Sequence, residues 1–467
     1  MKNKKLFILV PDGVGLRNFA YGGFCAHAKA QGFDVTFWND TAFDLTTLGF
    51  HEIKISGSRP HPMTYVLKNV RIQVDLNRNI RRSKDRVYDS YRFGFSYSDL
   101  KQTLRSWLTR ASILWHDSDS GIRKVRAQIK RRERSTPYYR QCLETLKAEK
   151  PDLIFCTNQR TVSCMAPVLA AQDLGIPTAT FIFSWDNLPK ATMALEPDFY
   201  VVWSAHMKKE LQYYYDYIAD DQIFVTGTPQ FEPHSDESLL VSRDAFFAEH
   251  QLDPAKKYIC YSGDDVTTSP NDPQYLADTA QAIRQLNASG GQLGLLFRRC
   301  PVDFSDRYDR ILADYKDVIV PVNPKWEKVG GAWNGMLPTK ADLVLQMNTI
   351  AHTEMVINLG SSMVFDYASF GKPCAYINYD VAQSLQPGWS VKTIYNFIHF
   401  RSMPSKNAVV WLNSADEIAD KVNDVLLGKT NPVTEARRWF ERINVLPAAE
   451  ASQRMVSAFD EMVRRKK

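Results

Sequence analysis

Residues 356–380 read VINLGSSMVFDYASFGKPCAYINYD, and this stretch defines the fold of the second half of the chain. A short apolar run at its start predicts a buried strand, and the Gly-Ser-Ser at 360–362 predicts a tight turn into a helix. Apolar residues recur on helical spacing over 363–370, until Gly371 and Pro373 end the helix and a second apolar run predicts the next strand. The order strand, turn, helix, strand is half of a βαβ unit, which belongs to a parallel sheet.

The turn at Gly360, Ser361 and Ser362 has the features of an anion-binding site. A helix that begins there presents free backbone amides, two hydroxyl donors and the positive end of its dipole, which suit a phosphate. Asp366 lies one helical turn beyond Ser362 on the same side, where a carboxylate suits the paired hydroxyls of a ribose. We therefore predict a site for a nucleotide diphosphate. The alternative is an ordinary serine-capped helix on which Asp366 is solvated.

Length and composition restrict the class of protein. A chain of 467 residues is too long for one ordinary core, so two or three domains are expected. No apolar run approaches about 18 residues, and the apolar run after the basic N-terminus is too short for a signal sequence. The seven cysteines are scattered without C-x-x-C spacing, which indicates free thiols in a reducing cytosol rather than disulfides or a zinc site. A cytoplasmic protein is therefore predicted.

The net charge of +6 is unevenly distributed. Residues 123–134 (RKVRAQIKRRER) contain seven Lys or Arg and one Glu, a composition that basic helices use at anionic lipid surfaces. The segment predicts peripheral contact with the inner face of a membrane, and the alternative is a solvated charged helix. No recognised nucleic-acid-binding motif accompanies the charge, so a nucleic-acid partner is not expected.

The chain begins with a predicted βαβ unit. An apolar strand at 6–10 runs into a Gly-rich loop over 11–24, which a helix and a second strand follow. Gly13 and Gly15 stand in the first turn, but the third glycine of a dinucleotide fingerprint is absent, so an NAD site is not expected. Asp12 ends the first strand, where open α/β sheets place their chemistry. Its alternative role is that of a turn former in Pro-Asp-Gly.

Strands and helices alternate along most of the remaining chain. Residues 70–76 (VRIQVDL) predict a strand within an irregular region, and residues 99–150 predict helices. Such alternation predicts a mostly parallel, doubly wound sheet, and the pattern restarts after about residue 230. The further predicted strands lie at 151–156, 177–183, 200–203 and 223–225, and then at 258–261, 294–297 and 318–322.

Two such domains, with a Gly-Ser turn and a helical carboxylate in the second, resemble the GT-B fold of sugar-nucleotide glycosyltransferases. Residues 360–373 (GSSMVFDYASFGKP) are similar to the S-S-x-x-x-D/E-x-x-x-x-G-K/R-P segment of polysaccharide glycosyltransferases and CDP-glycerol glycerophosphotransferases. The resemblance implies that the serine pair holds the donor diphosphate and that Asp366 binds ribose. Residues 183–190 (FSWDNLPK) are similar to the central region of bacterial GT-B transferases. Arg298 ends a strand similar to L-x-R-x-H-P, which places it to neutralise donor phosphate, with Cys300 in the position of that His.

The resemblance implies that the two expected domains have different functions. We predict an α/β protein of the GT-B class, with two doubly wound Rossmann-like domains facing a central cleft. Residues 1–230 are expected to form the acceptor domain and residues 231–430 the nucleotide-sugar donor domain. Residues 431–467 are expected to form C-terminal helices that pack back on the N-terminal domain.

Glycosyl transfer with inversion needs a base for the acceptor hydroxyl, and that base should lie in the N-terminal domain. Asp12 and Asp186 both end predicted strands there and are the catalytic candidates. Trp185 beside Asp186 offers an aromatic wall for a sugar ring. The alternative for this pair is core packing and helix capping. The predicted acceptor-binding residues are Gly13, Gly15, Trp185 and Asn187.

Metal-independent chemistry is expected, because GT-B enzymes generally stabilise the leaving diphosphate with helix N-termini and basic side chains. The chain has no evident Asp-x-Asp pair, and the adjacent Asp264 and Asp265 would point apart in an extended loop. No metal site and no cofactor are predicted, and the nucleotide-sugar is a substrate. The predicted donor-binding residues are Gly263, Arg298, Gly360, Ser361, Ser362 and Asp366.

The predicted function is transfer of a sugar from a nucleotide-activated donor to a glycan or lipid-linked acceptor in surface polysaccharide or glycolipid synthesis. One alternative is a transferase with another donor, either a CDP-glycerol glycerophosphotransferase or a CMP-Kdo transferase. A second is a sugar-nucleotide epimerase of the same fold, and a third is a non-catalytic binding protein. The expected partners are therefore the donor, the acceptor and an anionic membrane surface.

Overall fold

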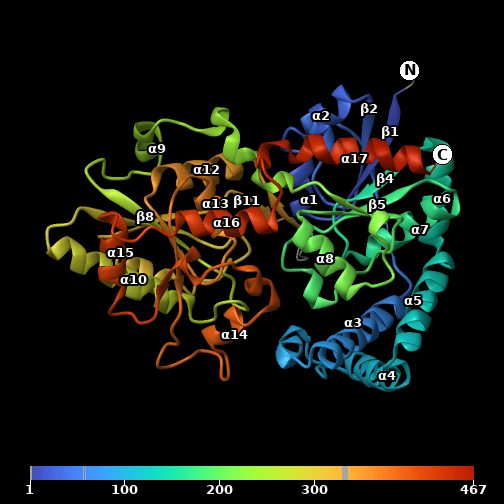
Figure 1. Cartoon of the computed structure of the whole chain (residues 1–467), viewed down its shortest axis with the longest axis horizontal. Helices are drawn as coiled ribbons and strands as arrows, with labels where there is room; N and C mark the ends of the chain where they lie inside the picture. The colour runs from blue at the N-terminus through green and yellow to red at the C-terminus, as the bar shows by residue number, and fades with distance from the viewer. Residues whose placement is uncertain (1–2, 56, 58, 329–334, 467) are drawn as a thin grey trace. The chain divides into compact units, whose positions relative to one another are not determined.

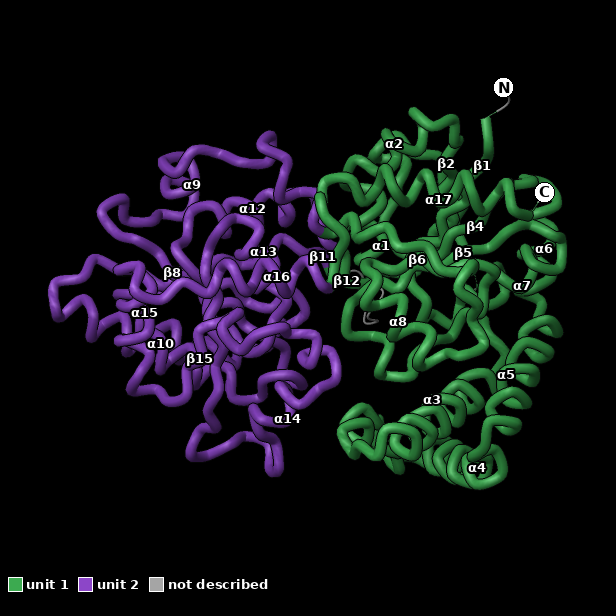
Figure 2. The backbone as a smooth tube through the Cα atoms, viewed as in Figure 1, with its two compact units in different colours: residues 1–230, 328–337, 443–467 green, residues 231–327, 338–442 purple. Residues whose placement is uncertain are grey.

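The computed structural model describes residues 3–55, 57, 59–328 and 335–466 (Figure 1). The chain divides into two compact units (Figure 2). Unit 1 comprises residues 1–230, 328–337 and 443–467, and unit 2 comprises residues 231–327 and 338–442. Each unit contains one parallel sheet with interleaved helices, so the chain has the doubly wound α/β architecture expected from its alternating pattern.

The sheet of unit 1 has, in the described part of the chain, seven parallel strands in the order β3-β2-β1-β4-β5-β6-β7. The central strand β1 is apolar and its last five residues are buried, as expected for a strand that is covered on both faces. The strands are β1 (Lys4–Val10), β2 (Phe33–Asn39), β3 (His51–Lys54), β4 (Leu153–Cys156), β5 (Thr178–Phe181), β6 (Phe199–Val202) and β7 (Ile223–Val225).

The helices of unit 1 include three long ones, α3, α4 and α5, which pack against one another and extend from the sheet (Figure 1). The last helix, α17, packs on α2 and β4, where Phe459 contacts Phe24 and Phe155. The C-terminal segment therefore belongs to the core of the first unit. The helices are α1 (Gly13–Phe19), α2 (Phe24–Ala30), α3 (Pro62–Ser83), α4 (Leu100–His116), α5 (Asp119–Arg134), α6 (Pro137–Glu149), α7 (Met165–Asp173), α8 (Ala205–Tyr214) and α17 (Ala451–Arg465).

Two local predictions for unit 1 are wrong. Residues 70–76 form part of the long helix α3 and not a strand. Their polar-apolar alternation is short, whereas Leu67, Val70 and Val74 are buried at helical spacing that continues the pattern of the whole segment. The predicted Gly-rich loop at 11–24 contains α1, because the Asp12 side chain caps a helix that begins directly after the strand.

The sheet of unit 2 has six parallel strands among the described residues, in the order β10-β9-β8-β13-β14-β15. The opening stretch of the sequence forms β13, the Gly-Ser turn, α13 and β14, as predicted. The strands are β8 (Lys257–Ser262), β9 (Leu293–Arg298), β10 (Ile319–Val322), β13 (Val356–Asn358), β14 (Cys374–Ile377) and β15 (Val410–Leu412). Two short strands, β11 (Trp326–Lys328) and β12 (Met336–Pro338), belong to neither of the two large sheets.

Helices connect the strands of unit 2, and α10 is the longest of those described. They are α9 (Arg243–Glu249), α10 (Asp272–Ala288), α11 (Asp309–Asp314), α12 (Lys340–His352), α13 (Met363–Ser369), α14 (Val391–Tyr395), α15 (Ile418–Leu426) and α16 (Val433–Ile443).

Both sheets reverse their strand order at one point. In unit 1 the reversal lies between β1 and β4, and in unit 2 it lies between β8 and β13. Connections leave such a pair of strands toward opposite sides of the sheet, and the crevice that this opens at the carboxyl ends is where open α/β sheets bind ligands. The residues that follow β1, β4, β8 and β13 are therefore the candidates for a ligand-binding site.

Candidate functional site

The crevice of unit 1 contains Asp12, which follows β1. Its Oδ1 accepts a hydrogen bond of 3.1 Å from the amide of Gly15, and its Oδ2 accepts one of 2.5 Å from Nδ2 of Asn158, which follows β4. Burial raises the pKa of Asp12 above its usual value, against the hydrogen bonds from Asn158 and the Gly15 amide. The sheet reversal thus brings together a buried carboxyl group and an amide side chain that the sequence analysis did not assign to the site.

The first turn of α1 approaches β4 closely. A Cβ on Gly15 would lie 2.5 Å from Oγ1 of Thr157, so this position accepts only glycine unless the strand end moves. Gly13 is buried in the same turn. Both glycines allow the backbone to lie against the crevice, and their predicted contact with an acceptor stays a prediction.

The second predicted catalytic residue, Asp186, lies in the loop after β5. Its Oδ1 accepts hydrogen bonds from Ser184 Oγ at 2.6 Å and from Asn187 Nδ2 at 2.8 Å, and its Oδ2 forms an ion pair with Lys190. Asn187 also accepts a 3.1 Å hydrogen bond from Nε2 of Gln159. The Asp186 carboxylate is therefore already neutralised by a neighbouring lysine, which favours a structural role over that of a free base.

Neighbouring residues at the end of β4 connect the two predicted carboxylates of unit 1. Asn158 contacts Asp12, and Gln159 contacts Asn187. The sequence signal for both amides was their position directly after the predicted strand at 151–156. Trp185 is 7% exposed and packs largely inside unit 1, so its predicted role as an open aromatic wall is limited to the small part of the ring that solvent reaches.

The crevice of unit 2 contains the turn between β13 and α13. Asn358 Oδ1 accepts a 2.9 Å hydrogen bond from the amide of Ser361, and Tyr376 donates a 2.8 Å hydrogen bond to the Ser361 carbonyl. Ser361 Oγ accepts from the amide of Met363 at 3.4 Å. In the described part of the chain, the Ser362 side chain accepts no hydrogen bond from a backbone amide of α13. The Ser362 hydroxyl is therefore not used as an N-cap, whereas the Ser361 hydroxyl accepts from the first amide of α13, as in the alternative interpretation of a serine-capped helix.

Gly360 is required by the geometry of this turn. Its φ of +69° lies in the left-handed region, and a Cβ would lie 2.9 Å from Cζ of Phe400. We expect Gly360→Ala to lower the free energy of unfolding by about 1–3 kcal/mol, measured by urea denaturation. Gly388→Ala is the matched control, because Gly388 has a φ of +76° but open space where its Cβ would lie. Equal losses in the two variants would show that contact with Phe400 contributes nothing.

Asp366 lies against His234 inside unit 2, in a contact that lacks hydrogen-bond geometry. Its Oδ1 lies 2.9 Å from Nε2 of His234, and both side chains are almost fully buried. The His234 ring stacks on Phe231 and packs edge-on against Phe370. No local signal in the sequence marks His234 as the partner of Asp366, because the two residues belong to distant segments. The predicted contact of Asp366 with ribose stays a prediction, and it would use the carboxylate oxygen that His234 leaves free.

Arg298 ends β9, as predicted, but its charge is already paired. Its Nη2 donates to the two carboxylate oxygens of Asp342 at 3.2 and 3.0 Å, and the pair is buried. Asp342 also accepts hydrogen bonds from the Lys325 amide and from Nε1 of Trp326. Among the described residues, Nη1 of Arg298 has no hydrogen-bond partner. That nitrogen is itself buried, and most of the positive charge of Arg298 is compensated by Asp342.

Asp264 follows β8 at the same reversal and is a residue that the sequence analysis did not assign to the site. Burial, together with the charges of Asp272 and Asp265, raises the pKa of Asp264 well above its usual value, while Arg307 and the backbone amide of Leu359 oppose this. Leu359 follows β13, so Asp264 bridges the two strands of the reversal. A raised pKa favours the neutral form of the carboxyl group, which can donate a hydrogen bond and does not repel an anion.

Gly263, the first residue after β8, lies in a closely packed position. A Cβ would lie 3.1 Å from the Phe297 ring, 3.1 Å from the Tyr308 hydroxyl and 3.2 Å from a carboxylate oxygen of Asp272. Its amide donates to the Arg298 carbonyl at 2.9 Å. Gly263 therefore keeps the strand end closely packed, and its predicted contact with a donor stays a prediction.

An open pocket of about 650 Å³ in unit 2 is lined by two rings that also lie near Gly360. These rings belong to Tyr395 and Phe400. Trp411 completes an aromatic wall, with its ring centroid 4.9 Å from that of Tyr395. The amide side chains of Asn378 and Asn413, which follow β14 and β15, also line the pocket. Rings beside polar amides suit a flat heterocycle that also carries hydrogen-bonding groups.

The described residues contain no group of three or more His, Cys, Asp or Glu side chains placed to hold a metal ion. Each of the seven cysteines is a free thiol. In the part of the chain that the structure describes, no helix is both long and apolar enough to cross a bilayer.

Comparison with known proteins identifies the fold but no sequence family. No family model matches the chain, and no curated protein sequence matches it. The chain is similar in structure to S. aureus MnaA in complex with UDP (TM-score 0.54, 11% identity, covering 99% of this chain and 97% of that one). It is also similar to a glycosyltransferase from Rickettsia africae (TM-score 0.53, 10% identity, covering 99% of this chain and 100% of that one). A third similar structure is the UDP-GlcNAc 2-epimerase from Methanocaldococcus jannaschii (TM-score 0.51, 12% identity, covering 98% of this chain and 99% of that one).

These likenesses extend over nearly the whole of each chain, and they agree with the two doubly wound sheets. The protein therefore has the GT-B fold, which its structural neighbours among glycosyltransferases and UDP-GlcNAc 2-epimerases share. The proposed kinship with CDP-glycerol glycerophosphotransferases receives no support from a family model.

Proposed function

We propose that the protein is a glycosyltransferase that transfers a sugar from a nucleotide-activated donor to a glycan or lipid-linked acceptor. The observation that carries the proposal is in unit 2, where the rings of Tyr395 and Phe400 pack near Gly360 of the serine turn and also line an aromatic pocket of about 650 Å³. The turn offers donors to a diphosphate, and the pocket offers rings and amides to a nucleotide base. The neighbour crystallised with UDP has the same fold, which is consistent with this assignment.

The donor diphosphate would be held without a metal. The Ser361 and Ser362 hydroxyls would supply donors, and Arg298 and the neutral form of Asp264 would add to them. Asp366, oriented by His234, would accept from a ribose hydroxyl. As the bond between the sugar and the diphosphate breaks, these donors stabilise the negative charge that develops on the leaving oxygen.

Unit 1 would supply the base. In an inverting transfer the acceptor hydroxyl attacks the anomeric carbon, its proton passes to a carboxylate, and the nucleotide diphosphate leaves. Asp12 fits this role better than Asp186, because Asp186 is paired with Lys190 whereas the partners of Asp12 are neutral amides. The raised pKa of Asp12 also makes its carboxylate a stronger base than an exposed aspartate.

A sugar-nucleotide epimerase is the second candidate, because neighbours of this fold and similar coverage include UDP-GlcNAc 2-epimerases. The two activities differ in what they need and release. A transferase releases nucleotide in proportion to acceptor, whereas an epimerase changes the sugar when no acceptor is present. Incubation of the full chain with each nucleotide-sugar, with and without an acceptor glycan, separates them when the products are analysed by NMR. The same assay with CDP-glycerol and CMP-Kdo tests the two other donors.

Nucleotide binding is the first test of the proposal. We expect one of UDP, GDP, CDP and CMP to raise the melting temperature of the full chain, because a ligand that binds only the native state stabilises it. At a ligand concentration about 100 times the Kd, the stabilisation is about 2.7 kcal/mol. We expect Trp411→Ala and Ser362→Ala each to weaken this shift.

The controls are exposed residues outside the crevice. Ser289→Ala, at the end of α10, should leave the shift unchanged, because the Ser289 hydroxyl contacts only its own helix. The proposal fails if none of the nucleotides shifts the melting temperature, or if Ser289→Ala reduces the shift as much as Ser362→Ala does.

A further inference from the structure

Helix α4 buries polar residues and exposes large apolar ones, the reverse of an ordinary surface helix. Its buried residues are the polar Ser106 and Thr109, which face the rest of the unit. Ser106 Oγ donates to the Ser96 carbonyl at 2.8 Å, and Thr109 Oγ1 donates within the helix. The large apolar residues lie outward, with exposed fractions of 90% for Leu100, 62% for Leu104, 60% for Trp107, 44% for Leu108, 82% for Leu114 and 87% for Trp115.

These six residues form one continuous stripe. At 3.6 residues per turn, positions 100, 104, 107, 108, 114 and 115 lie on a single face of the helix. A soluble helix normally turns such a face toward a core. Because the polar face of α4 already packs on α3 and α5, the apolar stripe is left to be covered by something outside the chain.

The charges around the stripe indicate what covers it. Residues 100–116 contain Lys101, Arg105 and Arg110 and no acidic residue. By helical geometry, Lys101 and Arg105 lie along one edge of the stripe and Arg110 lies along the other. Arg105 contacts the ring of Tyr65, and Arg110 contacts the ring of Phe95. In the described part of the chain, none of the three cations forms an ion pair with a carboxylate.

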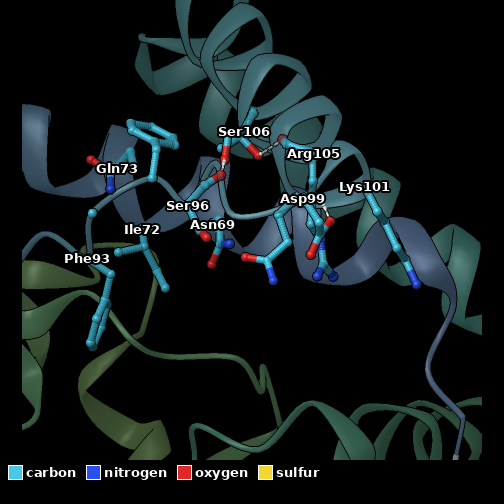
Figure 3. A pocket seen from close by; sticks show the side chains of 13 residues that line it. Asn69, Ile72, Gln73, Phe93, Ser96, Asp99, Lys101, Arg105 and Ser106 are labelled. Atoms are coloured by element: carbon cyan, nitrogen blue, oxygen red, sulfur yellow. Dashed lines mark hydrogen bonds between the residues drawn. The ribbon is translucent and has the colours of Figure 1, made fainter.

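A pocket of about 470 Å³ lies beside α4, between this helix, α3 and the segment that joins them (Figure 3). Lys101, Gln102 and Arg105 of α4 line it together with Asn69 and Gln73 of α3. Asp99 also lines the pocket, where its carboxylate caps the first turn of α4 by accepting from the Gln102 amide. The cationic and amide groups next to the apolar stripe suit the phosphate and polar groups that lie just above the acyl region of a bilayer.

We infer that α4 is a membrane-docking helix that lies in the interface of an anionic phospholipid bilayer. Leu and Trp on one face with Lys and Arg at its edges are the composition of helices that lie in that interface. Leu100, Leu104, Leu114 and the two tryptophans enter the acyl boundary, and Lys101, Arg105 and Arg110 contact anionic headgroups. This inference does not rest on the proposed enzymatic function.

The inference moves the expected membrane contact from α5 to α4. In the basic segment 123–134, Arg126 and Lys130 pair with Glu196, and Arg134 pairs with Asp173. Nearly half of that positive charge is therefore used inside unit 1. The segment also places no large apolar side chain at the surface, since Val125 and Ile129 are buried.

Vesicle binding by the full chain tests the inference. The protein is sedimented with vesicles of phosphatidylcholine alone and of phosphatidylcholine mixed with phosphatidylglycerol. We expect binding to the anionic vesicles that weakens as salt is raised. We expect the double variant Trp107→Gln with Trp115→Gln to lose binding. The triple variant Lys101→Gln, Arg105→Gln and Arg110→Gln should weaken binding by about a hundredfold.

Two further variants serve as controls. Leu385→Gln with Leu427→Gln removes exposed apolar residues of unit 2, which are 75% and 61% exposed, and should bind as the parent protein does. Arg123→Gln with Lys124→Gln removes exposed cations of α5 and should weaken binding less than the α4 triple variant. All substituted side chains are exposed, so circular dichroism should show an unchanged fold.

Three results would overturn the inference. The first is the absence of binding to anionic vesicles. The second is an equal loss of binding in the unit 2 control. The third is a dimer in analytical ultracentrifugation that the Trp107 and Trp115 substitutions convert to a monomer, because the stripe would then be covered by a second copy of the chain.

Discussion

Replacing Asp12 with asparagine should lower the turnover number by about 10²- to 10⁴-fold while leaving the affinity for the nucleotide unchanged. Asparagine has the same shape and keeps one acceptor oxygen, so the cap of α1 should persist, whereas its NH2 group faces the NH2 donor of Asn158 and that hydrogen bond is lost. What the variant loses is the carboxylate that would accept the proton of the acceptor. Steady-state kinetics with the donor identified by thermal shift would give the turnover number and the KM for donor separately.

The pH profile gives the same variant a second readout. Burial raises the pKa of Asp12, and the base must be deprotonated to act. Activity of the parent protein should therefore rise with pH along an acidic limb that lies above the range of an ordinary aspartate. Asp186→Asn is the matched comparison. This substitution should lower the turnover number far less, because the Asp186 carboxylate already forms an ion pair with Lys190. Turnover of Asp12→Asn within about threefold of the parent protein would show that Asp12 is only a helix cap.

Replacing Glu196 with glutamine should lower the free energy of unfolding by about 3–5 kcal/mol, measured by urea denaturation at neutral pH. Glu196 is 8% exposed and pairs with Arg71 at 3.2 Å, with Nη2 of Arg126 at 2.8 Å and with Lys130 at 2.6 Å. The variant would leave these cations buried or half-buried without their shared partner. Because Arg71 belongs to α3 and the other two cations to α5, the loss should be greatest in the contacts of these helices with the rest of unit 1.

The pH dependence of stability follows from the same network. Although burial acts in the opposite direction, the charges of Arg71, Arg126 and Lys130 lower the pKa of Glu196 to about 2, from 4.5. A depressed carboxyl pKa stabilises the native state above the unfolded value, and this contribution is lost as the pH falls from about 4.5 toward 2. A shift of this size corresponds to about 3 kcal/mol. The difference in stability between the parent protein and Glu196→Gln should therefore shrink across this pH range.

Asp75 provides the matched control for this prediction. It also contacts Arg71, at 3.6 Å, but burial raises its pKa to about 6. A raised carboxyl pKa has the opposite sign, so Asp75 costs stability as the pH rises from about 4 to 6. Asp75→Asn should therefore be much less damaging at neutral pH than Glu196→Gln. Similar losses in the two variants would show that volume and shape, not charge, dominate this part of the core.

Several features of the site follow from short-range pattern. Apolar runs, glycine stops and helical spacing predicted most of the strands, and with them the positions of Asp12, Asp186, Arg298 and Gly360 at strand ends or in the loops that follow them. These features depend on neighbours within a few residues, which is the range over which periodicity and turn chemistry act. The wrong strand prediction at residues 70–76 shows the limit of short-range patterns, because this short alternating run lies within a helix of 22 residues.

The sequence by itself therefore determined the two doubly wound units and the residues that end their strands. Only the tertiary structure decided which of those residues meet partners from distant segments, since Asp366 lies against His234 and Arg298 pairs with Asp342. It also decided that α4 turns its leucines and tryptophans outward. The physical reason is that the charge balance of a site and the buried face of a helix depend on the packing of separate segments in space, which the periodicity of one segment does not encode.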